Sequence, residues 1–170
     1  SGILDLSSHS YIIVQNGILN LNGITMKQVI FVQANTTTLV SQLSAETIVF
    51  SVGGALTIDG SGGFTTGSLS YIQSLNQLVT LQNSVEYVIN NSLLIRGTNV
   101  VNARLSSNSA TLRTIFTLNP SATQDVGFVT TTRLNSSSGQ TIYTRYGTLT
   151  DTLNWQLLRN PTTKATSFIL

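Results

Sequence analysis

Few residues of this chain could act as an acid, a base, a nucleophile or a metal ligand. The 170 residues include one histidine, six acidic residues and no cysteine. His9 lies in the polar run Ser7–Ser10, and a catalytic histidine needs an orienting carboxylate and a nucleophile beside it. Because serine is abundant in this chain, some contact between serine and this histidine is expected by chance, and we interpret His9 as an exposed residue without a catalytic role. The lack of cysteine excludes disulfides and thiolate chemistry.

The acidic residues are the next candidates, because glycoside hydrolysis uses two carboxylates about 5–9 Å apart. They are scattered along the sequence, although a fold could bring two of them together. They are Asp5, Glu46, Asp59, Glu86, Asp125 and Asp151. A β-helix carbohydrate-active enzyme therefore remains an alternative, which depends on two acids meeting in a cleft. Our first expectation is a protein that is not an enzyme, with no catalytic residue and no cofactor.

A glycine-rich segment, Asp59-Gly-Ser-Gly-Gly63, has the composition of a metal or phosphate loop. Calcium sites recruit several carboxylates, and a phosphate-binding loop carries a lysine after its glycines. Neither feature is present in this segment. The segment therefore predicts a flexible turn, and we expect no metal site.

Aromatic and basic residues gather near the C-terminal end, where Tyr143, Arg145, Tyr146 and Trp155 occur. Alternation along a strand places Tyr143 and Arg145 on one face, and Tyr146 on the other with the core. We expect Tyr146 and Trp155 to be buried, and Tyr143 and Arg145 to be the candidate ligand-binding residues, with surface glycans as the partner. The sequence has no dense basic patch, so we expect no nucleic-acid partner.

Three sequences have the pattern of N-glycosylation acceptors, which is Asn, any residue except Pro, then Ser or Thr. They begin at Asn35, Asn90 and Asn135. In a chain this rich in Asn, Ser and Thr, three such sites are close to the number expected by chance. They are candidate glycosylation sites if the protein is secreted.

The composition points to self-association. Charged residues make up 8% of the chain and hydrophobic residues 41%, whereas an ordinary soluble domain is about 25% charged. Net charge is only +2, so little long-range repulsion keeps copies apart. The apolar runs are a few residues long, which is too short for a membrane span.

The elements that would position these residues are short β-strands. Period-two runs rich in β-branched and aromatic residues recur at roughly eight- to twelve-residue spacing, which is typical of a β-sandwich, a barrel or a β-solenoid. The runs are 28–33, 46–52, 55–58, 78–81, 85–89, 93–95, 111–118, 126–134, 140–149 and 153–158.

Two other local signals bear on the fold. Asn16-Gly17 and Asn22-Gly23 predict tight turns, which belong either to a meander or to two corners of a solenoid coil. Apolar residues at helical spacing within Ser68–Leu81 predict a short helix, and a second helical turn is predicted to start at Thr38.

We therefore predict one all-β domain over residues 1–170. Its expected architecture is a two-sheet β-sandwich of jelly-roll type with one or two short helical connections. A β-solenoid, or parallel β-helix, is the alternative, since the strand spacing suits coils of about 20–25 residues. The late strands at 125–134 and 141–149 look too long for solenoid rungs, which favours the sandwich.

Both chain ends are apolar, and such ends fray unless a sheet holds them. Either they are edge strands of the same domain, or they complete the sheet of a neighbouring copy. The candidate self-association residues are Ile3, Leu4, Leu6, Phe168, Ile169 and Leu170. The sequence thus favours a non-enzymatic structural subunit of an extracellular filament, fibre or virion. A glycan- or host-surface-binding adhesin module is the second interpretation.

Overall fold

The computed structural model describes residues 12–14, 25–32, 36–39, 43–59, 62–73 and 75–158. Within these ranges the regular elements are all β-strands, so the all-β prediction is confirmed. No described segment forms a helix long and apolar enough to cross a bilayer. Several residues discussed above lie outside the described ranges. They include Asp5, His9, Asn35, Gly60, Ser61 and the terminal candidates Ile3, Leu4, Leu6, Phe168, Ile169 and Leu170.

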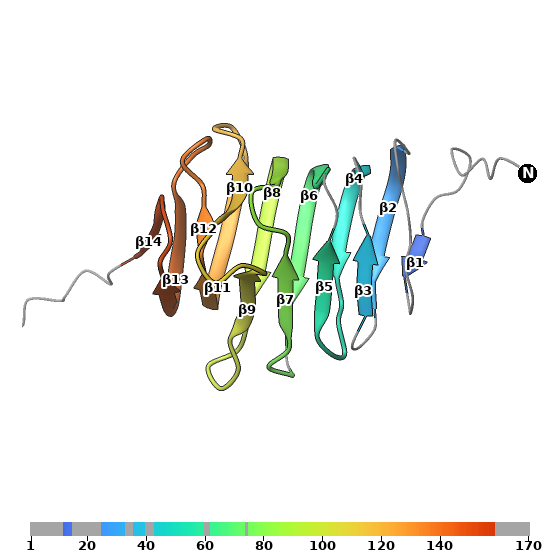
Figure 1. Ribbon diagram of the computed structural model, residues 1–170. Coiled ribbons are helices and arrows are strands. Elements are labelled where there is room, and N and C mark those ends of the chain that lie inside the picture. The colour runs from blue at the N-terminus through green and yellow to red at the C-terminus, as the bar shows by residue number, and fades with distance from the viewer. Residues whose placement is uncertain are drawn as a thin grey trace, which may run out of the picture.

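The described ranges contain fourteen strands (Figure 1). They are β1 (Ile12–Val14), β2 (Thr25–Phe31), β3 (Thr36–Leu39), β4 (Leu43–Phe50), β5 (Leu56–Asp59), β6 (Phe64–Ile72), β7 (Leu78–Leu81), β8 (Glu86–Arg96), β9 (Ala103–Ser107), β10 (Thr114–Leu118), β11 (Thr123–Thr132), β12 (Leu134–Asn135), β13 (Ile142–Thr150) and β14 (Trp155–Leu157).

The strands form one curled sheet, and every pairing among the described strands is parallel. Strands β2, β4, β6, β8, β11 and β13 pair successively, and β3, β5, β7, β9 and β11 form a second succession. In Figure 1 the row β3, β5, β7 and β9 lies in front of the row β2, β4, β6 and β8. The chain thus runs through a strand of one row and a strand of the other row before it returns to the first row and pairs with the earlier strand there.

Paired residues on neighbouring strands are separated by a variable number of positions in the sequence. We call the stretch of chain from one paired residue to the next a coil. Ile12 pairs with Val29, 17 positions later, and Leu43 pairs with Phe64, 21 positions later. The longest return joins Ser92 to Thr123, 31 positions later. The loops between strands take up most of this variation, and within the β6–β8 pair the register also shifts by one residue between Thr66 and Ser68.

The parallel pairing bears directly on the predicted architecture. A jelly-roll sandwich is built from antiparallel neighbours, whereas parallel neighbours need a long crossover connection. The sandwich prediction is therefore not confirmed, and the parallel curled sheet fits the β-solenoid alternative at least as well.

The long late strands, which favoured the sandwich, are each interrupted by a local turn of the backbone. Phe128 in β11 has φ of 52° and Tyr146 in β13 has φ of 61°. A positive φ in a non-glycine residue turns the backbone out of the extended conformation. Each of these strands therefore changes direction at its aromatic residue, and joins two short paired segments.

Both predicted helices are wrong. The segment Ser68–Leu81 contains most of β6 and all of β7, and Thr38 lies within β3. In the first segment Leu69 is buried, as the helix also required, but Ile72 is 63% exposed. Burial in β6 alternates with the period of a strand, so tertiary packing and not helical spacing decides the structure there.

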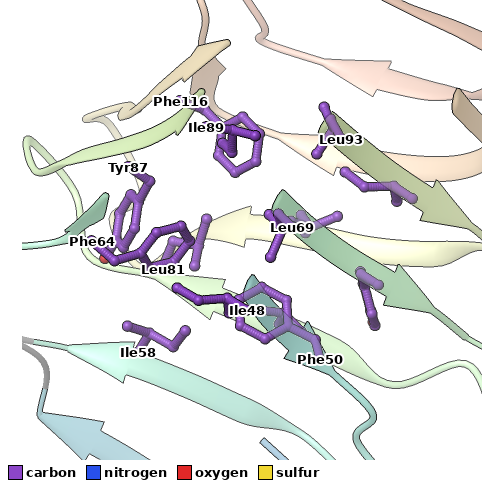
Figure 2. Close-up of a cluster of buried hydrophobic side chains, with 14 of the residues drawn as sticks. Ile48, Phe50, Ile58, Phe64, Leu69, Leu81, Tyr87, Ile89, Leu93 and Phe116 are labelled. Carbon is purple, nitrogen blue, oxygen red and sulfur yellow. The ribbon is translucent and has the colours of Figure 1, made fainter. Parts of the chain in front are cut away.

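The core consists of inward-facing side chains that repeat from strand to strand (Figure 2). Phe64 of β6 pairs in register with Tyr87 of β8, which pairs with Phe116 of β10. The rings of Phe64 and Tyr87 lie 4.8 Å apart in an edge-to-face arrangement. A second aromatic row joins Phe31 and Phe50 at 5.6 Å. These aromatic rows stabilise the interior of the coils because they bury apolar surface and because edge-to-face ring pairs attract one another.

The two Asn-Gly turns lie outside the described residues, but the strands that flank them are described. Ile12, Ile13 and Val14 of β1 pair directly and in parallel with β2. In a three-strand meander the middle strand would separate the first from the third. The direct parallel pairing of β1 with β2 does not fit a meander in which they are the first and third strands.

Candidate functional site

The predicted ligand-binding residues lie together on the outside of β13. Tyr143 is 40% exposed and Arg145 is also exposed, while Ile142 and Thr144 between and beside them are buried. The shared face predicted for Tyr143 and Arg145 is therefore correct. Trp155 is buried, as predicted, and packs against Phe116 with ring centroids 5.9 Å apart.

The prediction that Tyr146 belongs to the core is wrong, because Tyr146 is 56% exposed. Its positive φ interrupts the alternation of β13, so Arg145 and Tyr146 both point outward. Its ring stacks on that of Phe128, with centroids 4.8 Å apart and planes 19° from parallel. The two rings come from corresponding corners of successive coils, where both residues have positive φ. They form an aromatic wall on the surface.

A gap in the row of side chains lies beside this wall. Gly127 of β11 pairs in register with Arg96 of β8 on one side and with Arg145 of β13 on the other. Neighbouring strands are about 4.8 Å apart, so the two arginine stems leave the sheet about 10 Å from each other. Since Gly127 has no side chain, the position between them is a notch floored by backbone.

The two arginines at the notch differ in charge compensation. Arg96 is paired with Asp125: its Nε donates to Asp125 Oδ2 at 3.1 Å, and its Nη2 donates to the same oxygen. The Arg145 side chain makes no ion pair, hydrogen bond or ring contact with any residue that the structure describes. The notch thus has one neutralised and one uncompensated cation.

Two small surface hollows meet at this point. One, of about 190 Å³, is lined by Gln124, Asp125, Val126, Tyr143, Arg145 and Leu158. The other, of about 220 Å³, is lined by Arg96, Asp125, Val126, Gly127, Phe128, Arg145 and Tyr146. Asp125, Val126 and Arg145 line both. We call the surface formed by these two hollows the arginine notch.

A third hollow, of about 410 Å³, is lined by residues of the neighbouring strands β2, β4, β6 and β8. Its lining includes Glu46, Gly67, Asn90 and Asn91. Each of these three hollows holds a single carboxylate, Glu46 in this one and Asp125 in the other two. Among the described residues no three His, Asp or Glu side chains gather as a metal site.

The structure places two of the three candidate glycosylation sites. Asn90 is half-buried within β8, where it lines the third hollow. Asn135 is half-buried at the end of β12, and its Oδ1 accepts a hydrogen bond from the Ser137 backbone at 2.9 Å.

The C-terminal end of the described sheet has a second unusual surface. Of ten large hydrophobic side chains that are exposed in the described ranges, five fall within residues 143–158. The outer edge of β13 from Arg145 to Thr150 has no partner strand among the described residues, since β14 pairs only with Ile142–Thr144. We call this surface the C-terminal end face. Its exposed apolar residues are Tyr143, Tyr146, Leu153, Leu157 and Leu158.

Sequence reasoning found Tyr143 and Arg145 but missed the rest of the arginine notch. Arg96 and Asp125 are 29 positions apart and meet only because β8 and β11 are neighbours. Gly127 and Phe128 lie inside a run that has the pattern of one continuous strand. Comparison with protein-family models, with curated proteins and with solved structures finds no match to this chain.

Proposed function

We propose that this chain is a β-solenoid that acts as a non-enzymatic structural subunit of an extracellular filament, fibre or virion, and that its copies associate end to end. The observation that carries this proposal is the C-terminal end face, where the unpaired edge of β13 and five exposed apolar side chains lie within the same stretch, residues 143–158. An edge of that kind is a template for adding another strand.

The solenoid interpretation is supported by the register of the sheet. Three lines of buried side chains run from strand to strand, each on a different part of the coil. They pass through Phe64, Tyr87 and Phe116, through Ile48, Leu69 and Leu93, and through Leu56, Val79 and Leu105. A further coil from a second copy would extend all three lines.

Electrostatics also favour association at this end. Sheet edges are commonly protected by charged side chains, lysine above all. Between Ile142 and Leu158 the only ionisable groups of Asp, Glu, Lys, Arg or His type are Arg145 and Asp151. Few charges must be desolvated when this edge is covered, and the exposed leucines contribute about 25 cal/mol for each Å² buried.

The two ends of a parallel sheet are different surfaces. The described sheet ends in β1 and β3 on the N-terminal side, and in β13 and β14 on the C-terminal side. Contact between unlike surfaces repeats without closing and produces an open filament. The apolar chain ends predicted from the sequence, Ile3 to Leu6 and Phe168 to Leu170, are candidates to take part in the same contact.

Sedimentation velocity over a concentration series tests the proposal. We expect the wild-type chain to form species larger than a monomer as concentration rises. The variants Leu153→Lys and Leu157→Lys place a charge on the C-terminal end face, and both should shift the distribution toward monomer. Both leucines are more than 40% exposed, so the substitutions leave the core intact.

The matched control is Val100→Lys, which places the same charge on an apolar residue that is 85% exposed between β8 and β9. It should associate as the wild type does. A wild-type chain that stays monomeric throughout the series, or a Val100 variant that dissociates as fully as the Leu157 variant, contradicts the proposal.

A binding module for glycans or a host surface is the second candidate function. The observation that favours it is the arginine notch, where an uncompensated Arg145 lies beside the stacked rings of the exposed Tyr146 and the half-buried Phe128. Sites that bind small ligands are usually lined by aromatic rings and a few convergent polar groups. The arginine notch and the C-terminal end face share Tyr143, Tyr146 and Leu158, so a copy that covers the end face would compete with a ligand in the notch.

A further inference from the structure

We propose that the arginine notch binds a saccharide unit bearing one carboxylate. This inference rests on the second candidate function above. It names the class of ligand from the charge, shape and surface of the notch.

The charge of the notch selects an anion with a single negative charge. Arg96 is neutralised by Asp125, and Arg145 is uncompensated among the described residues, so one net positive charge remains. A planar guanidinium binds a carboxylate through two parallel hydrogen bonds. A nucleic-acid strand would need several cations along its backbone, and the notch has only one to offer.

The geometry of the notch leaves room for that anion beside Arg145. A Cβ atom on Gly127 would lie 3.3 Å from the Arg145 carbonyl oxygen and 4.0 Å from its Cβ. Glycine at this position therefore keeps the space next to the arginine stem open. The Gly127 backbone has no left-handed φ, so the lack of a side chain, and not conformational freedom, is what this position provides.

The remaining groups suit a sugar. Both hydrogen bonds from Arg96 go to Asp125 Oδ2, which leaves Oδ1 to accept from a sugar hydroxyl. The second hollow is lined by the Phe128 and Tyr146 rings. Aromatic faces carry partial negative charge and attract the weakly positive C–H groups of a pyranose ring. A carboxylated sugar offers all three partners at once.

Isothermal titration calorimetry with defined probes tests this assignment. The probes are trigalacturonate with its methyl ester, and 3′-sialyllactose with lactose, so that each acid has a neutral match. We expect at least one acid to bind, and its neutral match to bind about tenfold more weakly or not at all, since a charge-assisted hydrogen bond is lost.

Three variants locate the site. Arg145→Gln should weaken acid binding about tenfold, and Tyr146→Ala by about two- to tenfold through loss of the ring. Gly127→Ala should weaken binding with no change of charge, because its methyl group fills the notch. The control Lys27→Gln removes one positive charge from an exposed residue of β2, and should bind as the wild type does. Circular dichroism confirms that each variant is folded.

The possible outcomes distinguish a failure of the glycan-binding function from a failure of the ligand class proposed here. If neither the acids nor their neutral matches bind, both the glycan-binding function and this inference fail. If the neutral sugars bind as tightly as the acids, the function stands and the ligand class is wrong. If the acids bind but Arg145→Gln and Gly127→Ala have no effect, the binding site is elsewhere and the inference is overturned.

Discussion

The central coils and the C-terminal coil follow the same strand pattern but differ in their neighbours. Strand β6 pairs with β4 on one side and β8 on the other, whereas β13 pairs over six residues with β11 and over only three with β14. In β6 the alternation buries Leu69 and Tyr71, while in β13 it ends after Thr144. A coil thus needs a neighbouring coil on each side to bury its apolar side chains fully. The coils at the ends of the sheet are therefore the places where a second copy would bury the most additional apolar surface.

Polar groups show the same contrast. The buried Tyr71 hydroxyl donates to the Gln77 carbonyl at 3.0 Å, and the Tyr87 hydroxyl accepts from the Gln82 backbone N–H at 3.1 Å. In the C-terminal coil the buried Trp155 Nε1 has no hydrogen-bond partner among the described residues. The other buried side-chain atoms without a partner among the described residues are Thr131 Oγ1 and Ser136 Oγ, so all three lie C-terminal to β10.

The largest expected effect comes from emptying the central core. Tyr87→Ala removes a fully buried ring that packs on Phe64, and should lower the free energy of unfolding by about 3–5 kcal/mol. Tyr143→Ala in the terminal coil removes a ring that is 40% exposed, and should cost less than about 1 kcal/mol. Urea unfolding measures both. Equal losses would mean that the two coils do not differ as described.

A glycine at a coil corner should give the next largest effect. Gly63 has φ of +58°, and a Cβ atom there would lie 2.0 Å from the Glu86 carbonyl oxygen. Gly63→Ala should therefore cost about 1–3 kcal/mol or more. A Cβ atom on Gly53 would meet nothing within 4 Å, and Gly53 has no left-handed φ, so Gly53→Ala is the matched control. It should be neutral or stabilise by up to about 1 kcal/mol. A similar loss in both variants would refute the close packing at Gly63.

Alkaline pH should destabilise the central coils. Burial raises the pKa of the Tyr71 and Tyr87 hydroxyls above the ordinary value of 10.0. Above pH 10 the unfolded chain releases these protons while the folded chain retains them, so the unfolded state is favoured as pH rises. Each tyrosine contributes at most about 1.4 kcal/mol per pH unit.

Urea unfolding at pH 8, 10 and 11 measures this slope. The double variant Tyr71→Phe/Tyr87→Phe should unfold with a flatter dependence on pH above 10, although it loses some stability at pH 8 with its hydrogen bonds. A slope that the double variant leaves unchanged would show that other groups cause the alkaline loss.

The smallest effect is expected at a surface ion-pair cluster beside the terminal coil. Asp151 pairs with Arg113 and lies 3.9 Å from Arg133 Nε, and all three side chains are partly exposed. Asp151→Asn keeps the left-handed backbone that Asp151 adopts at φ of 51°, and removes only the charge. The loss should be about 0–1 kcal/mol and should shrink in 1 M salt. A larger, salt-independent loss would point to a structural role for this carboxylate.

Most strands could be predicted from period-two patterns, but their pairing could not. Leu78–Leu81 is predicted with its observed bounds, because both ends of β7 are marked by polar residues. The aromatic row does not show in the sequence, since Phe64 and Tyr87 are 23 positions apart and Tyr87 and Phe116 are 29 apart. Loops of unequal length hide the repeat from any search at a fixed period.

The candidate site could be predicted only where alternation holds. Tyr143 and Arg145 are two positions apart within one regular segment, so their shared face followed from the sequence. The exposure of Tyr146 was not predicted, because a residue with left-handed backbone inside a strand places its side chain on the opposite face from the one that alternation predicts. The β-propensity of the sequence does not indicate where such a residue occurs. The notch at Gly127 depends on three strands meeting in register, which is a tertiary property.

Fibre diffraction from oriented, concentrated protein tests the central claim most directly, namely that the terminal coil is completed by another copy. If copies stack end to end, the strands lie across the filament axis and the pattern has a meridional reflection near 4.8 Å. Leu157→Lys should abolish it. Protein that remains monomeric at the highest concentration, with no such reflection, would contradict the account.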